Sequence, residues 1–160
     1  MAKIRSMHAV ESPGDAQPGA IRLAFASGDR RTVDQHFGAA TQLVIYRIDA
    51  AGSRLVGVAQ FGSPAQDGNE DKLPAKLGEL AGCAGVYCQA VGPSAVRQLL
   101  AEGIQPLRVE PGSTICGLLA ETRALLCGPR PPRWIARHLD PESARLERFR
   151  AMVGRGWEDG

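Results

Sequence analysis

Apolar residues between residues 21 and 61 gather in short runs that turn residues separate. We expect β-strands at 21–26, 42–48 and 54–61, because each is an apolar run of strand length. Residues 49–53 (DAAGS) form a loop of hairpin length between the second and third runs. The pattern therefore predicts an antiparallel meander.

Beyond residue 70 the apolar positions change to a helical period. Leu73, Leu77 and Leu80 lie at helical spacing, which predicts a first helix with Pro74 in its first turn. Strand, helix, strand and helix then follow at 84–88, 94–102, 104–109 and 113–127. This alternation is typical of parallel crossover units. Pro106 lacks the amide that a central strand donates, so we expect its strand at a sheet edge.

These elements predict an α/β fold with one mixed five-stranded sheet in the order 3-2-1-4-5 and helices on both faces. Right-handed crossovers place strand 84–88 beside and parallel to strand 21–26. Ligands bind at the carboxyl ends of parallel strands, so we expect the loops after Ala26 and Cys88 to border one crevice. The topology resembles the ribonuclease H architecture. Strand 21–26 nevertheless lacks the carboxylates of a two-metal nuclease.

The same pattern divides the chain into three parts. We expect a flexible N-terminal segment at 1–20 and an α/β domain at 21–128. A proline-rich stretch (GPRPP) interrupts the chain there, and a helical C-terminal appendage is expected at 129–160. A helix in the appendage should begin at Asp140 and Pro141. Its apolar stripe consists of Leu146, Phe149 and Val153.

Composition narrows the class of protein. Hydrophobic residues make up 44% and charged residues 22% of the 160 residues, as in globular proteins. Residues 1–19 have no apolar run, and no stretch approaches the roughly 20 apolar residues of a membrane span, so we expect a cytoplasmic protein. The net charge of +2 is too small to indicate nucleic-acid binding. The excess lies in 128–160, where its arginines form either a solvated helical face or a partner patch.

Four cysteines lie in a chain without an export signal, and cytoplasmic thiols stay reduced. There is no Cys-x-x-Cys spacing and no zinc-like pattern with histidine, so we do not expect a closed structural metal site. Any metal must then be held openly by few ligands. We interpret Cys116 and Cys127 as packing residues of the helix 113–127.

The loop 28–38 (GDRRTVDQHFG) is the best candidate site, because it combines charges and a lone histidine directly after the first strand. A neutral imidazole at His36 is a good ligand for iron, and Asp34 is a candidate outer-shell partner. Arg31 and Gln35 complete the candidate binding residues of this loop. The alternative is a surface or core histidine that its neighbours satisfy.

Cys88 ends the adjacent strand, where its thiolate could supply a soft second ligand. The alternative is a small buried hydrophobic residue. The run from Gln89 to Ser94 leads into a helix N-terminus, which favours a bound anion but equally makes an ordinary strand-to-helix turn. His36 and Cys88 also suggest a base and a nucleophile, but no third member is evident. Hydrolase, phosphate-loop and dinucleotide motifs do not occur.

Several separated motifs closely resemble those of the nitrogenase accessory family that carries the iron-molybdenum cofactor and its precursors, of the NifX type and related to NifY and NafY. They are AFAS at 24–27, VDQHFG at 33–38, QDGNEDKL at 66–73, VYC at 86–88 and SAVRQL at 94–99. The likeness extends from residue 21 to the end of the chain. Some relatives carry an extra helical domain ahead of the core. The 20 residues before the first strand favour the single-domain type.

The resemblance implies a ribonuclease H-like fold and a role without catalysis. Family members bind the cofactor, or the iron-sulfur core made by NifB, and exchange it with the scaffold complex NifEN; apo-dinitrogenase is a further candidate partner. The histidine of the DQHFG motif is the family's favoured cluster-binding residue and corresponds to His36.

We therefore predict a cytoplasmic carrier of an iron-sulfur precursor of the iron-molybdenum cofactor. Its predicted metal ligands are His36 and Cys88, with Asp34, Gln35 and Arg31 as further binding residues. The alternative is an interaction module that stabilises the scaffold or apo-nitrogenase without binding the cluster.

Overall fold

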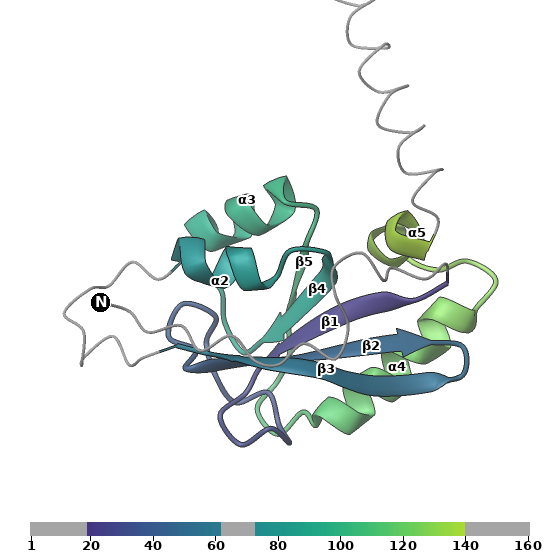
Figure 1. The fold of residues 1–160 in the computed structure, drawn as a ribbon, viewed down its shortest axis with the longest axis horizontal. Coiled ribbons are helices and arrows are strands. Elements are labelled where there is room, and N and C mark those ends of the chain that lie inside the picture. The colour runs from purple at the N-terminus through teal and green to yellow at the C-terminus, as the bar shows by residue number, and fades with distance from the viewer. Residues whose placement is uncertain (1–18, 62–72, 140–160) are drawn as a thin grey trace, which may run out of the picture.

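The computed structural model describes residues 19–61 and 73–139 (Figure 1). Its first half contains β1 (Ile21–Ala26), β2 (Gln42–Asp49), β3 (Gly52–Gln60) and α2 (Leu73–Glu79). Its second half contains β4 (Cys83–Cys88), α3 (Pro93–Ala101), β5 (Gln105–Arg108), α4 (Ile115–Cys127) and α5 (Arg133–Leu139). The elements predicted between residues 21 and 127 are confirmed in type and order, with boundaries that differ by one or two residues.

The five strands form one mixed sheet in the order β3-β2-β1-β4-β5, as predicted. The first three strands pair antiparallel, whereas β4 lies parallel to both β1 and β5. Pro106 lies in the edge strand β5, where its missing amide costs no hydrogen bond within the sheet. The carboxyl ends of β1 and β4 consequently lie side by side at one end of the sheet.

The two faces of the sheet carry separate hydrophobic cores. Successive side chains of β1 point to opposite faces, so Ala24 packs in one core and Phe25 in the other. Leu80, next to α2, and Leu99 of α3 cover the first face. Ile115 of α4 and Ile135 of α5 cover the second. Figure 1 shows α2 and α3 on one side of the sheet and α4 on the other, which makes a three-layer α/β fold.

Helix α5 packs on the sheet although it belongs to the predicted appendage. Ile135 is 0% exposed, and Trp134 packs against the same core. The described part of 129–160 is thus continuous with the α/β domain. The helix start at Asp140, the stripe from Leu146 to Val153 and the N-terminal residues 1–18 lie outside the described residues.

One expectation for α4 is wrong, because Cys116 and Cys127 are exposed instead of packed. Leu125 of the same helix is also 45% exposed. Each cysteine follows a buried residue, Ile115 or Leu126, and one residue turns a helix by about 100°. The buried face of α4 is therefore narrower than the apolar pattern indicated. None of the described helices is long and apolar enough to cross a membrane.

Gly85→Ala should destabilise the fold, because α5 and β5 leave no space above this strand position. A Cβ at Gly85 would lie 3.1 Å from both Leu107 Cδ1 and Trp134 Cζ3, and 3.2 Å from the carbonyl oxygen of Gln105. We expect a loss of about 1–3 kcal/mol in the free energy of unfolding, measured by urea denaturation.

Gly78→Ala is the matched control. It lies in α2 with no atom within 4 Å of the added Cβ, so it should be neutral or stabilise the helix by about 0.5–1 kcal/mol. A Gly85→Ala protein as stable as the Gly78→Ala protein would contradict the described packing of α5.

Candidate functional site

The candidate loop crosses the carboxyl ends of β1 and β4. Three backbone hydrogen bonds hold it there: Gln35 N to Ala26 O (3.3 Å), Gln89 N to Gln35 O (3.0 Å) and Phe37 N to Ala90 O (2.8 Å). The predicted proximity of the loops after β1 and β4 is confirmed. Residues 35–37 hydrogen-bond across these strand ends, so backbone contacts join the two loops there. His36 lies between the two hydrogen bonds to the segment after β4.

The first half of the loop is anchored to the start of α4. Val33 N donates to Ser113 O at 3.0 Å, and Ile115 N donates to Arg31 O at 2.8 Å. Thr114, between these two anchors, caps α4 by accepting a hydrogen bond from the Gly117 amide at 3.0 Å. The loop is thus attached to elements on both sides of the sheet.

Three glutamine side chains hold the loop further. The Gln35 amide makes two hydrogen bonds with Thr41, one to its hydroxyl (2.9 Å) and one from its backbone N–H (3.1 Å). Gln42 donates to Gly28 O at 3.0 Å, and Gln89 donates to Val33 O at 3.1 Å. Because these bonds occupy the amide of Gln35, its described role is to shape the loop.

Asp29 organises the turn that begins the loop. Its carboxylate accepts hydrogen bonds from the backbone N–H of Arg31 and of Thr32 at 2.8 Å each. The hydroxyls of Thr32 and Ser27 donate to the same group at 2.9 and 3.1 Å. These donors, the backbone N–H of Thr32 foremost, hold the pKa of Asp29 well below its ordinary value. The turn also places Arg30 in the left-handed region, with φ of 63°.

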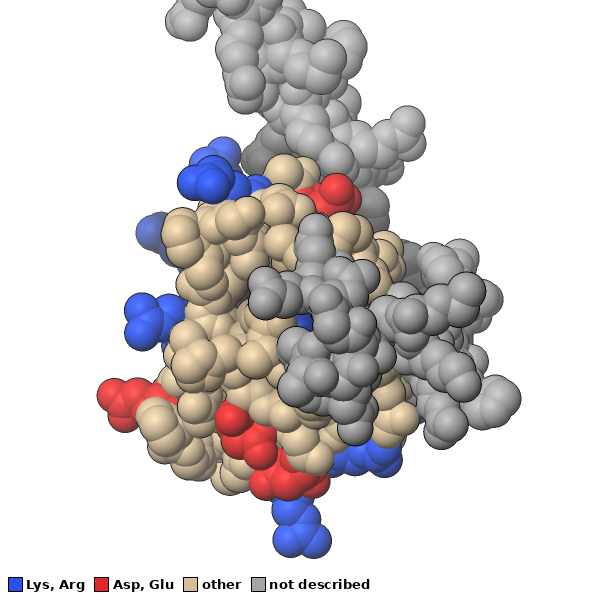
Figure 2. All heavy atoms as spheres, turned by 90° about the vertical axis from the view of Figure 1, so that its left-hand side faces the viewer, with Lys and Arg blue, Asp and Glu red and all other residues tan. Residues whose placement is uncertain are grey.

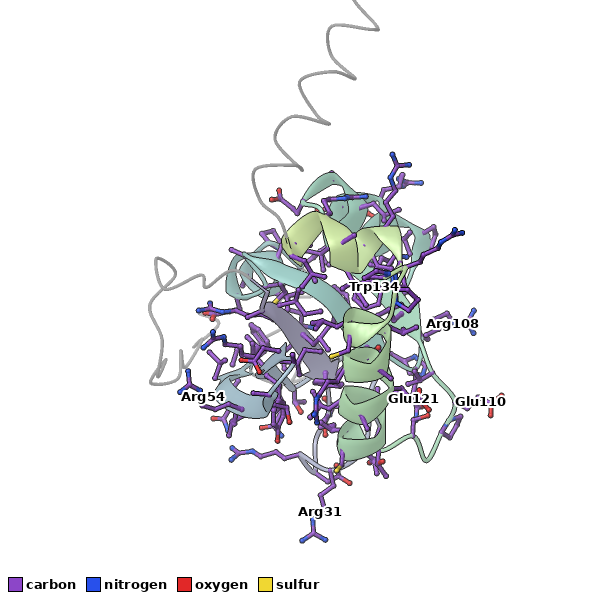
Figure 3. All side chains as sticks on the ribbon, turned by 90° about the vertical axis from the view of Figure 1, so that its right-hand side faces the viewer. Arg31, Arg54, Arg108, Glu110, Glu121 and Trp134 are labelled. Atoms are coloured by element: carbon purple, nitrogen blue, oxygen red, sulfur yellow. The ribbon has the colours of Figure 1, made fainter. Side chains whose placement is uncertain are left out.

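The predicted binding residues of the loop differ in their exposure and in their hydrogen-bond partners. His36 is exposed, between half-buried Gln35 and fully buried Phe37. Asp34 accepts a hydrogen bond from the Gly28 amide at 2.7 Å, so its carboxylate closes the turn. Within 19–61 and 73–139, no hydrogen bond joins Asp34 to the His36 ring. Arg31 projects into solvent beside the start of α4 (Figure 3).

Cys88 ends the neighbouring strand, but its thiol points into the core. The residue is 0% exposed, and its Sγ lies 3.9 Å from Leu107 O. Burial raises the pKa of Cys88 to about 11, whereas a metal ligand must be a thiolate. The structure brings the backbones around His36 and Cys88 together without placing both side chains on one surface. Ligation by Cys88 stays a prediction, and its burial gives that prediction no support.

The N-terminus of α3 lies next to the anchor of His36. Ala90 O accepts the Phe37 amide, and the helix begins at Pro93, three residues later. The N-cap residue Gly92 has no side chain that could cap the first turn, and Pro93 has no N–H. The amides of the first turn therefore face outward without a side-chain cap, as an anion-binding helix end requires.

Lys76 is a residue of the site that the sequence analysis missed. It comes from α2, is 1% exposed, and its Nζ donates to Phe37 O (3.1 Å) and Gly38 O (2.7 Å). The same nitrogen lies 6.0 and 5.7 Å from the ring centres of Phe37 and Phe61. One signal was available, because Lys76 follows Leu73 by three positions and so falls on the apolar face of the helix.

Charge near the site is mixed. Figure 2 views the end of the molecule where β1 and β4 finish, and acidic and basic side chains meet at its lower edge. The exposed charged residues of the loop are Asp29, Arg30, Arg31 and Asp34. In the part of the chain that the structure describes, no three His, Cys, Asp or Glu side chains are grouped to hold a metal ion. Described residues thus provide an exposed imidazole and helix amides but no closed metal cage.

Comparison with known proteins connects this loop to a family. The family model described as dinitrogenase iron-molybdenum cofactor matches residues 19–124. The chain belongs to this family. It is 40% identical over 156 residues to the protein NifX of Azotobacter vinelandii, covering 97% of each chain. It is also 37% identical over 136 residues to NifX of Rhodobacter capsulatus, covering 80% of this chain and 84% of that one.

The chain is also similar to part of a longer protein. The FeMo cofactor biosynthesis protein NifB of Azotobacter vinelandii is 31% identical over 91 residues, which is 54% of this chain and 18% of that one. The matched range 19–124 contains the whole sheet and the loop with His36, whereas α5 lies outside it. Membership of the family, predicted from the motifs, is confirmed.

Thiol labelling can test the described burial of the cysteines. Cys116 and Cys127 are exposed and should react with a disulfide reagent at pH 8 within minutes. Cys83 and Cys88 are buried, and burial raises their pKa values to about 12 and about 11, so both should react only after denaturation. Reaction of Cys88 in the folded protein as fast as that of Cys116 would show that the end of β4 is open.

The depressed pKa of Asp29 predicts how loop stability depends on pH. Folding favours the carboxylate, so its stabilising contribution is fully present above the unfolded value of 3.8 and is lost as the pH falls toward the lower folded value. The difference in free energy of unfolding between the natural protein and Asp29→Asn should therefore shrink as the pH falls from 5 to 3. Chemical denaturation at several pH values measures it. A constant difference would contradict the hydrogen bonds described for Asp29.

Proposed function

We propose that this protein carries an anionic iron-sulfur precursor of the iron-molybdenum cofactor in the cytoplasm and exchanges it with the NifEN scaffold, with NifB as the source. The observation that carries the proposal is the exposed imidazole of His36, in a loop fixed on both sides by hydrogen bonds. Membership of the cofactor family supports the identity of the cargo.

The chemistry of the loop suits an iron ligand. A neutral imidazole offers a nitrogen to iron without a proton-transfer step at neutral pH. The residues on both sides of His36 are anchored through their backbone, so a cluster can bind without first ordering the chain. The described carboxylates of the turn, Asp29 and Asp34, are occupied by local N–H groups.

Positive partial charges also lie beside His36, where they would stabilise an anionic cargo. The uncapped first turn of α3 presents backbone amides, and such a helix end favours an anion by about 0.3–1 kcal/mol. A binding site of one imidazole and weak electrostatic contacts leaves most metal positions of a cluster open to a partner's ligands. We infer a carrier that releases its cargo by ligand exchange.

We propose that this role does not include catalysis by a cysteine. Cys88 directly precedes Gln89, which hydrogen-bonds to the loop, and burial raises the pKa of Cys88 to about 11, so little thiolate forms at neutral pH. The hydrogen bonds of Asp34 and Gln35 shape the loop. We assign them to support of His36 rather than to a reaction.

His36→Ala tests the proposal directly. Mixed anaerobically with donor-bound precursor, the natural protein should retain iron through gel filtration. The variant should retain it at least about tenfold less tightly, because even loss of an outer-shell partner of a metal ligand costs about 10–100-fold in affinity. The retained iron is measured by colorimetric assay per mole of protein.

His138→Ala is the matched control, since this half-buried histidine contacts Gly103 O at 3.2 Å, away from the loop. It should retain iron like the natural protein. Equal retention by His36→Ala and His138→Ala would remove His36 from the site. If the natural protein binds the scaffold but retains no iron, the interaction module replaces the carrier as the function.

A further inference from the structure

A buried ammonium group lies directly behind the cluster-binding loop. Lys76 is 1% exposed, and its Nζ donates to the carbonyl oxygens of Phe37 and Gly38, the two residues that follow His36. The hydrogen bond to Gly38 O is 2.7 Å long, within the range of charge-assisted bonds. Lysine is rarely buried to this extent, so its presence here calls for a specific reason.

We propose that Lys76 is a positioning residue that fixes His36 for cluster binding by holding the two carbonyl groups after it. This assignment rests on the proposed function of His36. In this proposal α2, a helix of seven residues, sets the geometry of a loop that lies far from it in the sequence.

The hydrogen bonds around His36 show what the lysine adds. Before His36, the backbone N–H and C=O of Gln35 are both bonded to the strand ends. After it, the Phe37 amide is bonded to Ala90 O, but the chain turns away there. Phe37 O accepts from Ala40 N at 3.3 Å, and Lys76 adds a second donor at 3.1 Å and reaches on to Gly38 O. Consecutive carbonyls are thereby fixed in orientation, which sets the direction in which the chain leaves His36.

Packing alone does not require an ammonium group at this position. The side chain lies between the rings of Phe37 and Phe61, where methionine would fill a similar volume. Removing an ammonium from water costs several kcal/mol, a cost that an apolar side chain avoids. The hydrogen bonds to the loop carbonyls are a property that lysine has and methionine lacks. This difference defines the experiment.

Two substitutions at position 76 separate hydrogen bonding from packing. Lys76→Met keeps the apolar volume and removes the donors, whereas Lys76→Gln keeps N–H donors on a shorter side chain. Leu80→Val is the control for lost stability, because Leu80 is buried in the same core and its side chain has no hydrogen-bond donor. Iron retention is measured with donor-bound precursor at a temperature at which circular dichroism shows every variant to be folded. Amide hydrogen exchange of Phe37 is compared with that of Phe25 in β1.

We expect Lys76→Met to weaken iron retention about 10–100-fold, the range for outer-shell partners of metal ligands. Exchange at Phe37 should accelerate relative to Phe25. Lys76→Gln should recover part of both properties, and Leu80→Val should retain iron like the natural protein with an unchanged exchange ratio.

Suppose that folded Lys76→Met retains iron like the natural protein, whereas His36→Ala loses it. This result would overturn the role of Lys76 and leave the carrier function intact. Equal losses in Lys76→Met and Leu80→Val would overturn it as well, because general destabilisation would then suffice. If Lys76→Gln recovers neither the iron retention nor the Phe37 exchange rate that Lys76→Met has lost, the hydrogen-bond assignment is overturned. Full retention by His36→Ala would instead contradict the proposed function itself.

Discussion

The hydrogen bonds between residues 35–37 and the ends of β1 and β4 are the constraint on which the rest of the site depends. Parallel strands end with backbone groups that need partners, here Ala26 O and the segment at Gln89 and Ala90. The loop supplies these partners and therefore runs across the strand ends. Phe37 then points into the core, and its neighbour His36 points out. His36 is therefore exposed because the loop supplies hydrogen-bond partners to the backbone groups at the strand ends.

The sequence predicted the features that follow from the local apolar pattern and from the general rules of sheet topology. Apolar runs and helical spacing predicted the strand order, because right-handed crossovers leave few alternatives. Pro106 marked an edge strand because a central strand needs the amide that proline lacks. The loop after β1 could be identified as a candidate site from its composition and its motif. These predictions depend on chain neighbours and general rules of chirality.

What the sequence could not show depends on contacts between distant elements. Cys88 was correctly placed at the end of a strand, but alternation along β4 and the layer of α2 and α3 bury its thiol. The hydrogen bonds that the loop makes across the strand ends also join segments far apart in the sequence. Lys76 was missed, because its contacts with Phe37, Gly38 and Phe61 join segments that are far apart in the sequence. In each case the orientation of one side chain depends on packing that no local pattern specifies.

We propose a carrier whose rigidity lies in the backbone and whose metal contact is a single exposed imidazole. A closed four-ligand cage would hold its metal permanently, whereas one nitrogen and a helix end allow transfer. In this proposal the His36 ring contacts the cargo. Nuclear magnetic resonance of 15N-histidine-labelled protein during loading with donor-bound precursor tests this contact. The ring signals of His36 should shift or broaden, while those of His138 should stay unchanged. Unchanged His36 signals in protein that has taken up iron would contradict it.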